Sequence, residues 1–289
     1  MHPFRYVAPT TIDEAVAVLT EHGERARPLA GGTDLLVQTR TGRFDLDTVV
    51  DIKRIPELTT LSLSPEGLTL GAAVPCYQVY ESEEVARAYP GLIDAASLIG
   101  GIQIQSRASI GGNLSNASPS ADGIGPLIVH YAQANIAGPS GQRSIPVEDF
   151  CAGPGRSVLG NGEFLVSLTI PLPPPSFGAA YQRFIPRNEM DIAIAGVASS
   201  ISLNGAGDRI ESARIALAAV GPTPILALGA GNALAGKAPS AEEFAEAGEA
   251  AASVCSPIDD MRGDAEYRRE LVRVLTRRTL TTALERARG

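Results

Sequence analysis

Two pairs of adjacent glycines are the residues best suited to hold a ligand. Gly31-Gly32 stands in "RPLAGGTDLLVQ" and Gly111-Gly112 in "RASIGGNLSNASPSAD". Each pair follows a residue that can end a strand and precedes small hydroxyl or amide residues. Because glycine lacks a Cβ, ligand oxygens can approach the backbone N–H groups, and consecutive N–H groups form an anion-binding concavity. Two such turns facing each other would hold a diphosphate.

Polar side chains beside the glycines add further binding groups. Neutral donors stand at Thr33, Ser109, Asn113 and Ser118. Carboxylates at Asp34 and Asp122 suit ribose or ribityl hydroxyls. A glycine pair on its own is more often a plain tight turn, which is the simplest interpretation of the neighbouring Gly100-Gly101.

Other nucleotide-binding motifs do not fit the sequence. No G-x-G-x-x-G follows the first strand-like run, and "GNALAGKAP" (231–239) resembles a P-loop but has Ala238 where a Mg²⁺-binding Ser or Thr belongs. The sequence therefore supports neither a Rossmann site nor a nucleoside triphosphatase.

Composition narrows the functional class. At 289 residues the chain has room for two domains of about 150 residues. Its net charge of -8 opposes binding to nucleic acid or an anionic membrane. Neither a membrane-spanning apolar stretch nor a signal-peptide pattern is seen, so we expect no membrane span and a cytoplasmic location.

Cysteine and histidine are too scattered for a metal centre. Cys76, Cys151 and Cys255 form no C-x-x-C, and we interpret them as buried thiols. The histidines His2, His22 and His130 form neither an H-E-x-x-H motif nor a catalytic triad. The sequence thus predicts no metal site and no catalytic residues of the chain's own.

The elements that position the glycine loops begin with a small α/β unit. "TTIDEAVAVLTEHG" predicts a helix with a Thr11–Glu14 capping box, closed by Gly23. "ARPLAGG" and "DTVVDI" predict two strands. Hairpins are predicted across 65–67 and 138–142, with a helix between them near "PGLIDAASLIG".

A proline-rich segment, "IPLPPPSFG" (170–178), marks the main predicted domain boundary, because it can continue neither a helix nor a central strand. After it, three strand-like runs and helical stretches over 223–235, 240–254 and 263–287 predict an α+β domain. The last helix carries a stripe of Arg269, Arg273 and Arg277, which is either a solvated face or a docking surface for an acidic partner.

The two glycine segments together resemble the FAD-contacting loops of the FAD-binding medium subunit of molybdenum hydroxylases, the family of xanthine dehydrogenases and aerobic carbon monoxide dehydrogenase. The resemblance continues through "DFCAGPGRSVLGNGEFLVSLTIPLP", "YQRFIPRNEMDIAIAGVA" and "ARIALAAVGPTPILA". It covers nearly the whole chain in order.

The resemblance implies an α+β fold: a PCMH-type, vanillyl-alcohol oxidase-like FAD domain of two α/β subdomains (1–57 and 58–175), then a C-terminal domain (176–289) with a three-stranded antiparallel sheet and helices. Carried over by position, Leu29 to Leu35 and Ser109 to Asn113 would wrap the FAD pyrophosphate, and Ser118 and Asp122 would bind sugar hydroxyls. Leu165 and Arg183, where relatives often have Lys, would lie near the flavin ring, where a cation favours reduced flavin. No histidine stands in or beside either loop, which favours non-covalent FAD.

The family also implies partner subunits. A large subunit would carry molybdopterin and a small one two 2Fe-2S clusters, in a dimer of heterotrimers, and this chain's FAD would pass electrons to an external acceptor. The Gln105-Ser106 pair departs from the Arg-Asn of many relatives. Two alternatives remain open at this point: a stand-alone flavin oxidase or dehydrogenase of the same fold, and a non-catalytic diphosphate-binding scaffold.

Overall fold

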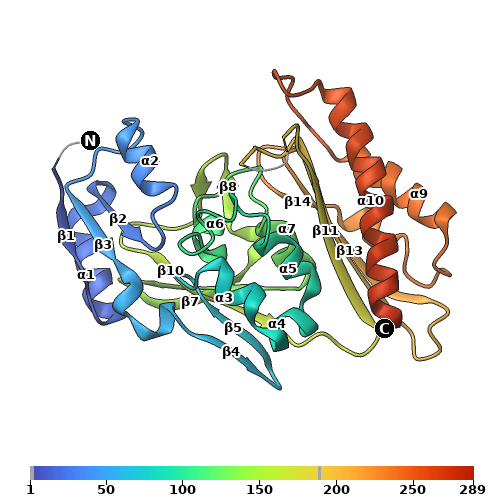
Figure 1. The fold of residues 1–289 in the computed structure, drawn as a ribbon, viewed down its shortest axis with the longest axis horizontal. Coiled ribbons are helices and arrows are strands. Elements are labelled where there is room, and N and C mark those ends of the chain that lie inside the picture. The colour runs from blue at the N-terminus through green and yellow to red at the C-terminus, as the bar shows by residue number, and fades with distance from the viewer. Residues whose placement is uncertain (1–2, 188–189) are drawn as a thin grey trace.

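The computed structural model describes residues 3–187 and 190–289, arranged as three successive units along the long axis (Figure 1). The first unit is a parallel sheet in the order β1-β3-β2, with helices α1 and α2. Its elements are β1 Arg5–Val7, α1 Ile12–His22, η1 Gly23–Arg25, β2 Ala26–Leu29, α2 Leu35–Arg40, β3 Thr48–Asp51, η2 Ile52–Arg54 and η3 Pro56–Leu58.

The predicted first helix and its caps are confirmed, with one change. The Thr11 hydroxyl accepts a bond from the backbone N–H of Glu14, and Gly23 ends α1 with φ of 54°. The Glu14 carboxylate reaches back to the N–H of Thr10 at 2.8 Å instead of that of Thr11. The helix N-terminus is therefore capped in both directions, as the sequence indicates.

The second unit is an antiparallel sheet in the order β4-β5-β10-β6-β7, covered by short helices. Both predicted hairpins are confirmed as β4-β5 and β6-β7, and β10 joins them. The elements are β4 Leu61–Ser64, β5 Gly67–Gly71, α3 Cys76–Glu81, α4 Glu83–Ala88, α5 Pro90–Ala96, α6 Ile110–Ser115, α7 Ile124–Val129, β6 Gln133–Gly138, β7 Gly141–Pro146, η4 Val147–Asp149, β8 Cys151–Gly153, β9 Arg156–Ser157 and β10 Phe164–Pro171.

The third unit is an antiparallel sheet in the order β11-β12-β13-β14 with helices on it. Its elements are β11 Phe177–Phe184, β12 Ala195–Leu203, β13 Ile210–Ala218, β14 Ile225–Leu226, α8 Leu228–Asn232, α9 Ala241–Ser253 and α10 Ala265–Arg288. The three predicted strands are the long ones, and β14 adds a fourth of two residues.

The predicted helix over 223–235 is largely wrong. Within that stretch, Ile225 and Leu226 pair with β13, and only 228–232 is helical. Pro224 disfavours helical backbone at Thr223, the residue before it, and the chain then enters the sheet at Ile225.

The proline-rich segment connects the second and third units. Strand β10 ends at Pro171, which pairs only with Gly67 of β5, beyond the residues that pair with β6. Strand β11 starts at Phe177, so a central strand does extend into the segment but stops at its first proline.

Ion pairs hold the third unit against the second, and two of them lie outside the cleft described below. The Asp94 carboxylate of α5 accepts from Arg286 of α10 at 2.6 and 2.9 Å, and Arg286 also donates to the carbonyl of Ala179. Glu148 pairs with Arg214 of β13 at 2.6 Å. One hydrophobic core includes side chains of both units, so these pairs sit at the edge of continuous apolar packing.

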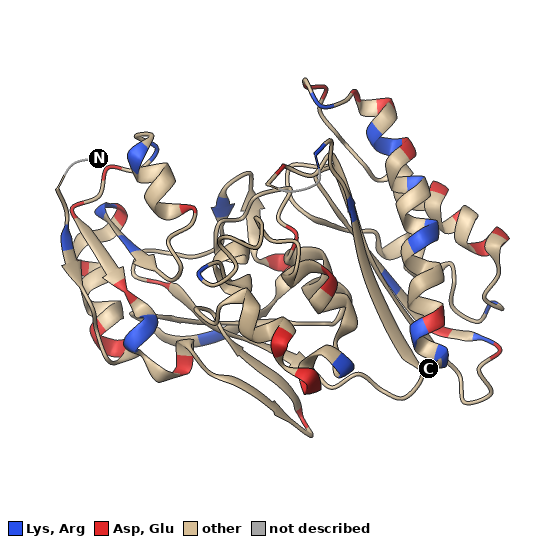
Figure 2. Ribbon diagram, in the orientation of Figure 1, with Lys and Arg blue, Asp and Glu red and all other residues tan. Residues whose placement is uncertain are grey.

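Basic residues recur along α10 (Figure 2). The predicted stripe of Arg269, Arg273 and Arg277 belongs to this helix. Arg273 is engaged within the chain, since it donates to Glu249 of α9 at 2.8 Å and to Glu270 at 3.2 Å. In the portion of the chain that the structure describes, no helix combines the length and apolarity needed to cross a membrane.

The interdomain pair gives a stability test. Replacing Arg286 by Ala strands the Asp94 carboxylate and the Ala179 carbonyl, so we expect the free energy of unfolding to fall by about 1–3 kcal/mol. Arg288→Ala, two residues on and exposed, should change it by under about 0.5 kcal/mol. Equilibrium urea denaturation of both variants measures this, and equal midpoints would contradict the assigned role of the pair.

Candidate cofactor cleft

The first glycine loop links β2 to α2. Gly32 adopts φ of 76°, a left-handed conformation that glycine takes without strain. Behind the loop, the Lys53 ammonium donates to the carbonyl of Ala30 at 2.8 Å and to the Asp51 carboxylate at 2.6 Å. Tyr6 donates to the same carboxylate. This anchor fixes the entry to the loop.

The second glycine pair lies within the first turn of α6. Ser109 is extended, forms an isolated bridge with Pro75, and caps the helix by accepting from the N–H of Gly112 at 3.0 Å. The Asn113 side chain accepts from the N–H of Gly123 at 2.9 Å, which ties α6 to the segment before α7. The second pair is thus helical, unlike the tight turn of the first.

The two loops touch through bare backbone. A Cβ on Gly31 would lie 1.8 Å from the carbonyl oxygen of Arg107 and 3.1 Å from the backbone nitrogen of Ala108. A Cβ on Gly111 would lie 2.5 Å from the Cα of Ala72. Both glycines are therefore required for chain-to-chain packing. Gly112 differs, because its Cβ would meet only the Ser109 hydroxyl, at 2.9 Å.

The loops line one cleft of about 920 Å³, to which all three units contribute. Its volume lies in the usual range for small-molecule sites of about 300–1,000 Å³. The site residues predicted from the sequence that line it are Ala30, Gly31, Gly32, Thr33, Asp34, Leu35, Ser109, Gly111, Gly112, Asn113, Ser118, Asp122, Leu165 and Arg183.

Two predicted site residues lie outside the cleft walls. Ile110 is the first residue of α6, and its side chain is fully buried in the core. Leu29 ends β2, and its side chain packs beside Gly32. Gln105, one of the two residues that differ from the Arg-Asn pair of many relatives, also points elsewhere. Its buried amide donates to the carbonyl of Ser97 at 2.8 Å.

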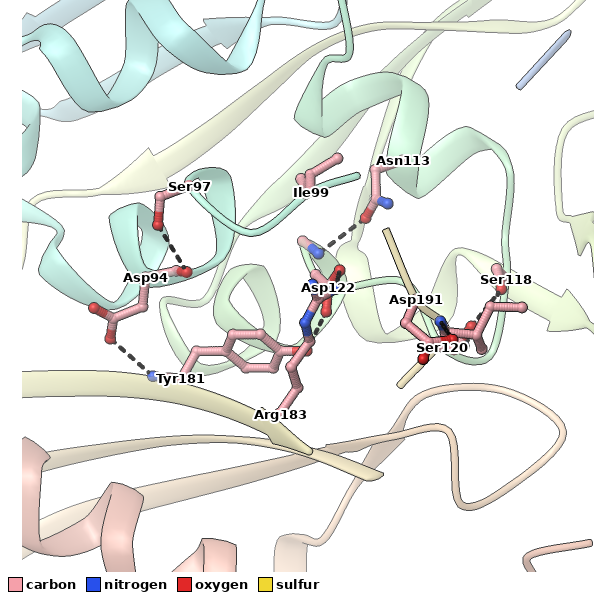
Figure 3. A network of polar contacts seen from close by, with 12 residues as sticks. Asp94, Ser97, Ile99, Asn113, Ser118, Ser120, Asp122, Tyr181, Arg183 and Asp191 are labelled. Carbon is pink, nitrogen blue, oxygen red and sulfur yellow. Dashed lines mark hydrogen bonds and ion pairs between the residues drawn. The ribbon is translucent and has the colours of Figure 1, made fainter. Parts of the chain in front are cut away.

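A buried ion pair between the second and third units forms part of the cleft wall. Arg183 of β11 donates to one Asp122 oxygen at 2.5 Å, and the Tyr181 hydroxyl donates to the other at 2.7 Å (Figure 3). The Arg183 side chain is 6% exposed, which excludes a surface role, and its Nε has no partner among the described residues. Burial raises the pKa of Asp122, while the Arg183 charge and the Tyr181 bond oppose that shift.

Further groups in the cleft were not indicated by any sequence pattern. Arg27 and Arg43 both lie over the Phe44 ring, 5.0 and 5.7 Å from its centroid. Burial raises the pKa of Asp34, and the charge of Arg43 acts against that shift. These side chains come from the first unit and make that part of the cleft partly cationic and partly aromatic.

The cysteines are unpaired, as their spacing indicates. Cys76 and Cys255 are buried, and burial raises the pKa of the Cys76 thiol to about 12. Among the described residues, no cluster of three or more His, Cys, Asp or Glu side chains is arranged to hold a metal ion.

Comparisons with known proteins cover the whole length of the chain. Residues 2–173 match the family described as FAD binding domain in molybdopterin dehydrogenase, and residues 179–283 match the CO dehydrogenase flavoprotein C-terminal domain. The carbon monoxide dehydrogenase medium chain of Hydrogenophaga pseudoflava is 32% identical over 283 residues, which cover 98% of each chain.

Two further relatives agree. The xanthine dehydrogenase FAD-binding subunit of Escherichia coli O157:H7 is 32% identical over 287 residues, covering 98% of this chain and 97% of that one. The solved structure of reconstituted CO dehydrogenase from Oligotropha carboxidovorans has a TM-score of 0.94 at 32% identity, covering 99% of both chains.

The backbone contact between the loops predicts a sharp sequence requirement. Gly31→Ala places a methyl group where the Arg107 carbonyl lies, so we expect a loss of about 1–3 kcal/mol of stability from overpacking. Gly205→Ala is the control, since no atom lies within 4 Å of its Cβ position. Thermal unfolding of both variants tests this, and a G31A midpoint equal to that of G205A would show that the loops can separate freely.

Proposed function

The chain belongs to the FAD-binding family of the molybdopterin dehydrogenases, and we propose that it is the flavin-carrying, electron-transferring subunit of a molybdenum hydroxylase complex. It is then an oxidoreductase component whose chemistry resides in its cofactor. One observation carries the proposal: two distant glycine segments meet and line a single cleft of suitable size.

The residues present fit FAD. Apart from the Ser109 hydroxyl, no atom lies within 4 Å of a Cβ position on Gly112, so a ligand can come close to the backbone there. The buried Nε of Arg183, which has no partner among the described residues, offers a donor and a positive charge in the same cleft. An elongated dinucleotide with a diphosphate and a ring system matches a cleft that combines bare backbone, cations and apolar walls.

We assign the predicted residues their roles on this basis. The segments from Leu29 to Leu35 and from Ser109 to Asn113 would hold the pyrophosphate, although Leu29 and Ile110 would act only through their backbone or through packing. Ser118 and Asp122 would bind sugar hydroxyls, and each Asp122 oxygen already accepts one bond and keeps a second acceptor site. Leu165 would pack by the flavin.

When bound, FAD would accept and release electrons. The chain's own contribution would be to bind, orient and tune it. Arg183 would place a charge in the cleft that favours reduced flavin. His22 and His130 do not line the cleft, and His2 lies outside the described residues, so we propose that the FAD is held non-covalently.

We propose that two partners complete the enzyme: a large subunit with molybdopterin and a small subunit with 2Fe-2S clusters, assembled as a dimer of heterotrimers. The names of the relatives, medium chain and FAD-binding subunit, support this. The same names disfavour a stand-alone flavin oxidase. We place the complex in the cytoplasm, which three unpaired cysteines favour.

Flavin binding tests the cofactor assignment and the scaffold alternative. The purified chain should take up FAD and show the visible absorption of bound flavin. Gly112→Val puts a larger side chain into the cleft beside the Ser109 hydroxyl, so we expect FAD binding to weaken at least about tenfold, or about 1.4 kcal/mol. Gly229→Val, on an open face of α8, should bind like wild type. Failure of the wild-type chain to bind FAD would favour the scaffold.

Partner capture tests the assembly. Native mass spectrometry of the tagged chain from its host should show a large molybdopterin-containing chain and a small chain with 2Fe-2S clusters, in equal numbers. Because the electrons would originate on those partners, flavin reduction by the complex's substrate should be lost when they are removed. A flavin-loaded monomer that oxidises a small alcohol or amine unaided would instead establish the stand-alone oxidase.

A further inference from the structure

Tyr181 is buried next to the cleft wall without lining the cleft itself. Tyr181 and Arg183 stand two residues apart on β11 and project from the same face of the strand. Both donate to Asp122, one to each oxygen (Figure 3). Arg183 and Asp122 line the cleft, whereas Tyr181 is 3% exposed and is not among its lining residues. The Asp122 carboxylate thus joins a hydroxyl outside the cleft to a cation within it.

Two glycines lie next to the Tyr181 side chain and leave space for it. A Cβ on Gly196 of β12 would lie 2.8 Å from the Tyr181 hydroxyl oxygen. A Cβ on Gly125 of α7 would lie 3.9 Å from a carbon of the ring edge. The backbone N–H of Tyr181 donates to the Asp94 carboxylate at 3.0 Å, and Arg286 donates to the same carboxylate. Ring, hydroxyl and backbone are therefore all fixed, and the hydroxyl is aimed at Asp122.

The contacts of Tyr181, Asp122 and Arg183 bear on the net charge that lines the cleft. Among the described residues, Asp122 is the carboxylate that pairs with the Arg183 guanidinium and offsets its charge locally. Burial favours a proton on Asp122, while the Tyr181 bond and the charge of Arg183 favour the carboxylate. Asp191, a further carboxylate of the cleft lining, is bonded to Arg187. Loss of the Tyr181 hydroxyl would leave one buried Asp122 oxygen without its donor and favour the protonated acid.

We infer that Tyr181 is a positioning residue for the bound cofactor: its hydroxyl holds the Asp122 carboxylate against Arg183, and thereby lowers the reduction potential of flavin in the cleft. Without the hydroxyl, the charge of Arg183 is less compensated and reduced flavin is favoured. The inference rests on the proposed function, because it requires flavin to occupy the cleft.

The test is the midpoint potential of the FAD-loaded full chain, measured by reductive titration with a reference dye. For Tyr181→Phe we expect reduction to become at least tenfold more favourable, a rise of about 30 mV for a two-electron couple. Asp122→Asn removes the compensating charge outright and should raise the potential at least as far. In the double variant the effects should not add, because Tyr181 acts through the Asp122 charge.

Tyr89→Phe is the matched control. Tyr89 is fully buried in the same core, and its hydroxyl donates to the backbone carbonyls of Ile170 and Pro171, which do not line the cleft. It should lose comparable stability with no change in potential. A Tyr181→Phe chain that retains flavin at the wild-type potential would overturn the inference, because a purely structural tyrosine predicts that result.

A second variant decides the matter if Tyr181→Phe does not retain flavin. Gly196→Ala keeps the hydroxyl but forces it to move, so it should raise the potential in the same direction. An unchanged potential in this variant also overturns the inference. Absence of bound flavin in the wild-type chain is a different failure, since it removes the proposed function and this inference with it.

Discussion

The close approach of two backbone segments at Gly31 is the constraint on which the rest of the site depends. The carbonyl of Arg107 occupies the space that any side chain at position 31 would fill. Because protein interiors are close-packed, such a contact tolerates little displacement. It brings the parallel sheet of the first unit against the helical cover of the second. The cleft exists because those two units meet there and leave a channel beside the contact.

The third unit completes the cleft by a different kind of interaction. Its edge strand β11 brings Arg183 to Asp122, and the two form a buried ion pair. Removing either partner alone would leave the other charge buried without its partner and destabilise the protein. The same strand is tied to α5 and α10 through Asp94 and Arg286. Charge at the cleft is therefore linked to how the C-terminal domain docks, and the domain is part of the site as well as its support.

Local signals in the sequence predicted local structure well. Thr11 and Gly23 mark the ends of α1 because capping is a matter of neighbouring residues, and the turn residues of both hairpins act in the same way. The predicted helix over 223–235 was wrong at its start, where Pro224 disfavours helical backbone at Thr223 and the chain pairs with β13 instead. The addition of β14 could not be foreseen, since pairing with β13 depends on tertiary contacts.

The candidate site shows the same difference between local sequence signals and tertiary contacts. The glycine loops stood out by composition. Gly31 and Gly111 must be glycine because they pack against the backbone of Arg107 and Ala72, and residue spacing does not reveal this. The pairing of Asp122 with Arg183 and Tyr181 joins residues 61 and 59 positions apart. The family resemblance placed Asp122 and Arg183 in the site but gave no indication that they bond to each other.

Hydrogen–deuterium exchange of the full chain with and without FAD tests the central claim most directly. If both glycine segments clasp one dinucleotide, stoichiometric FAD should slow exchange at 30–35 and at 109–113 together, with the same dependence on FAD concentration. Protection confined to one segment, or arising at different FAD concentrations in the two, would contradict a shared site.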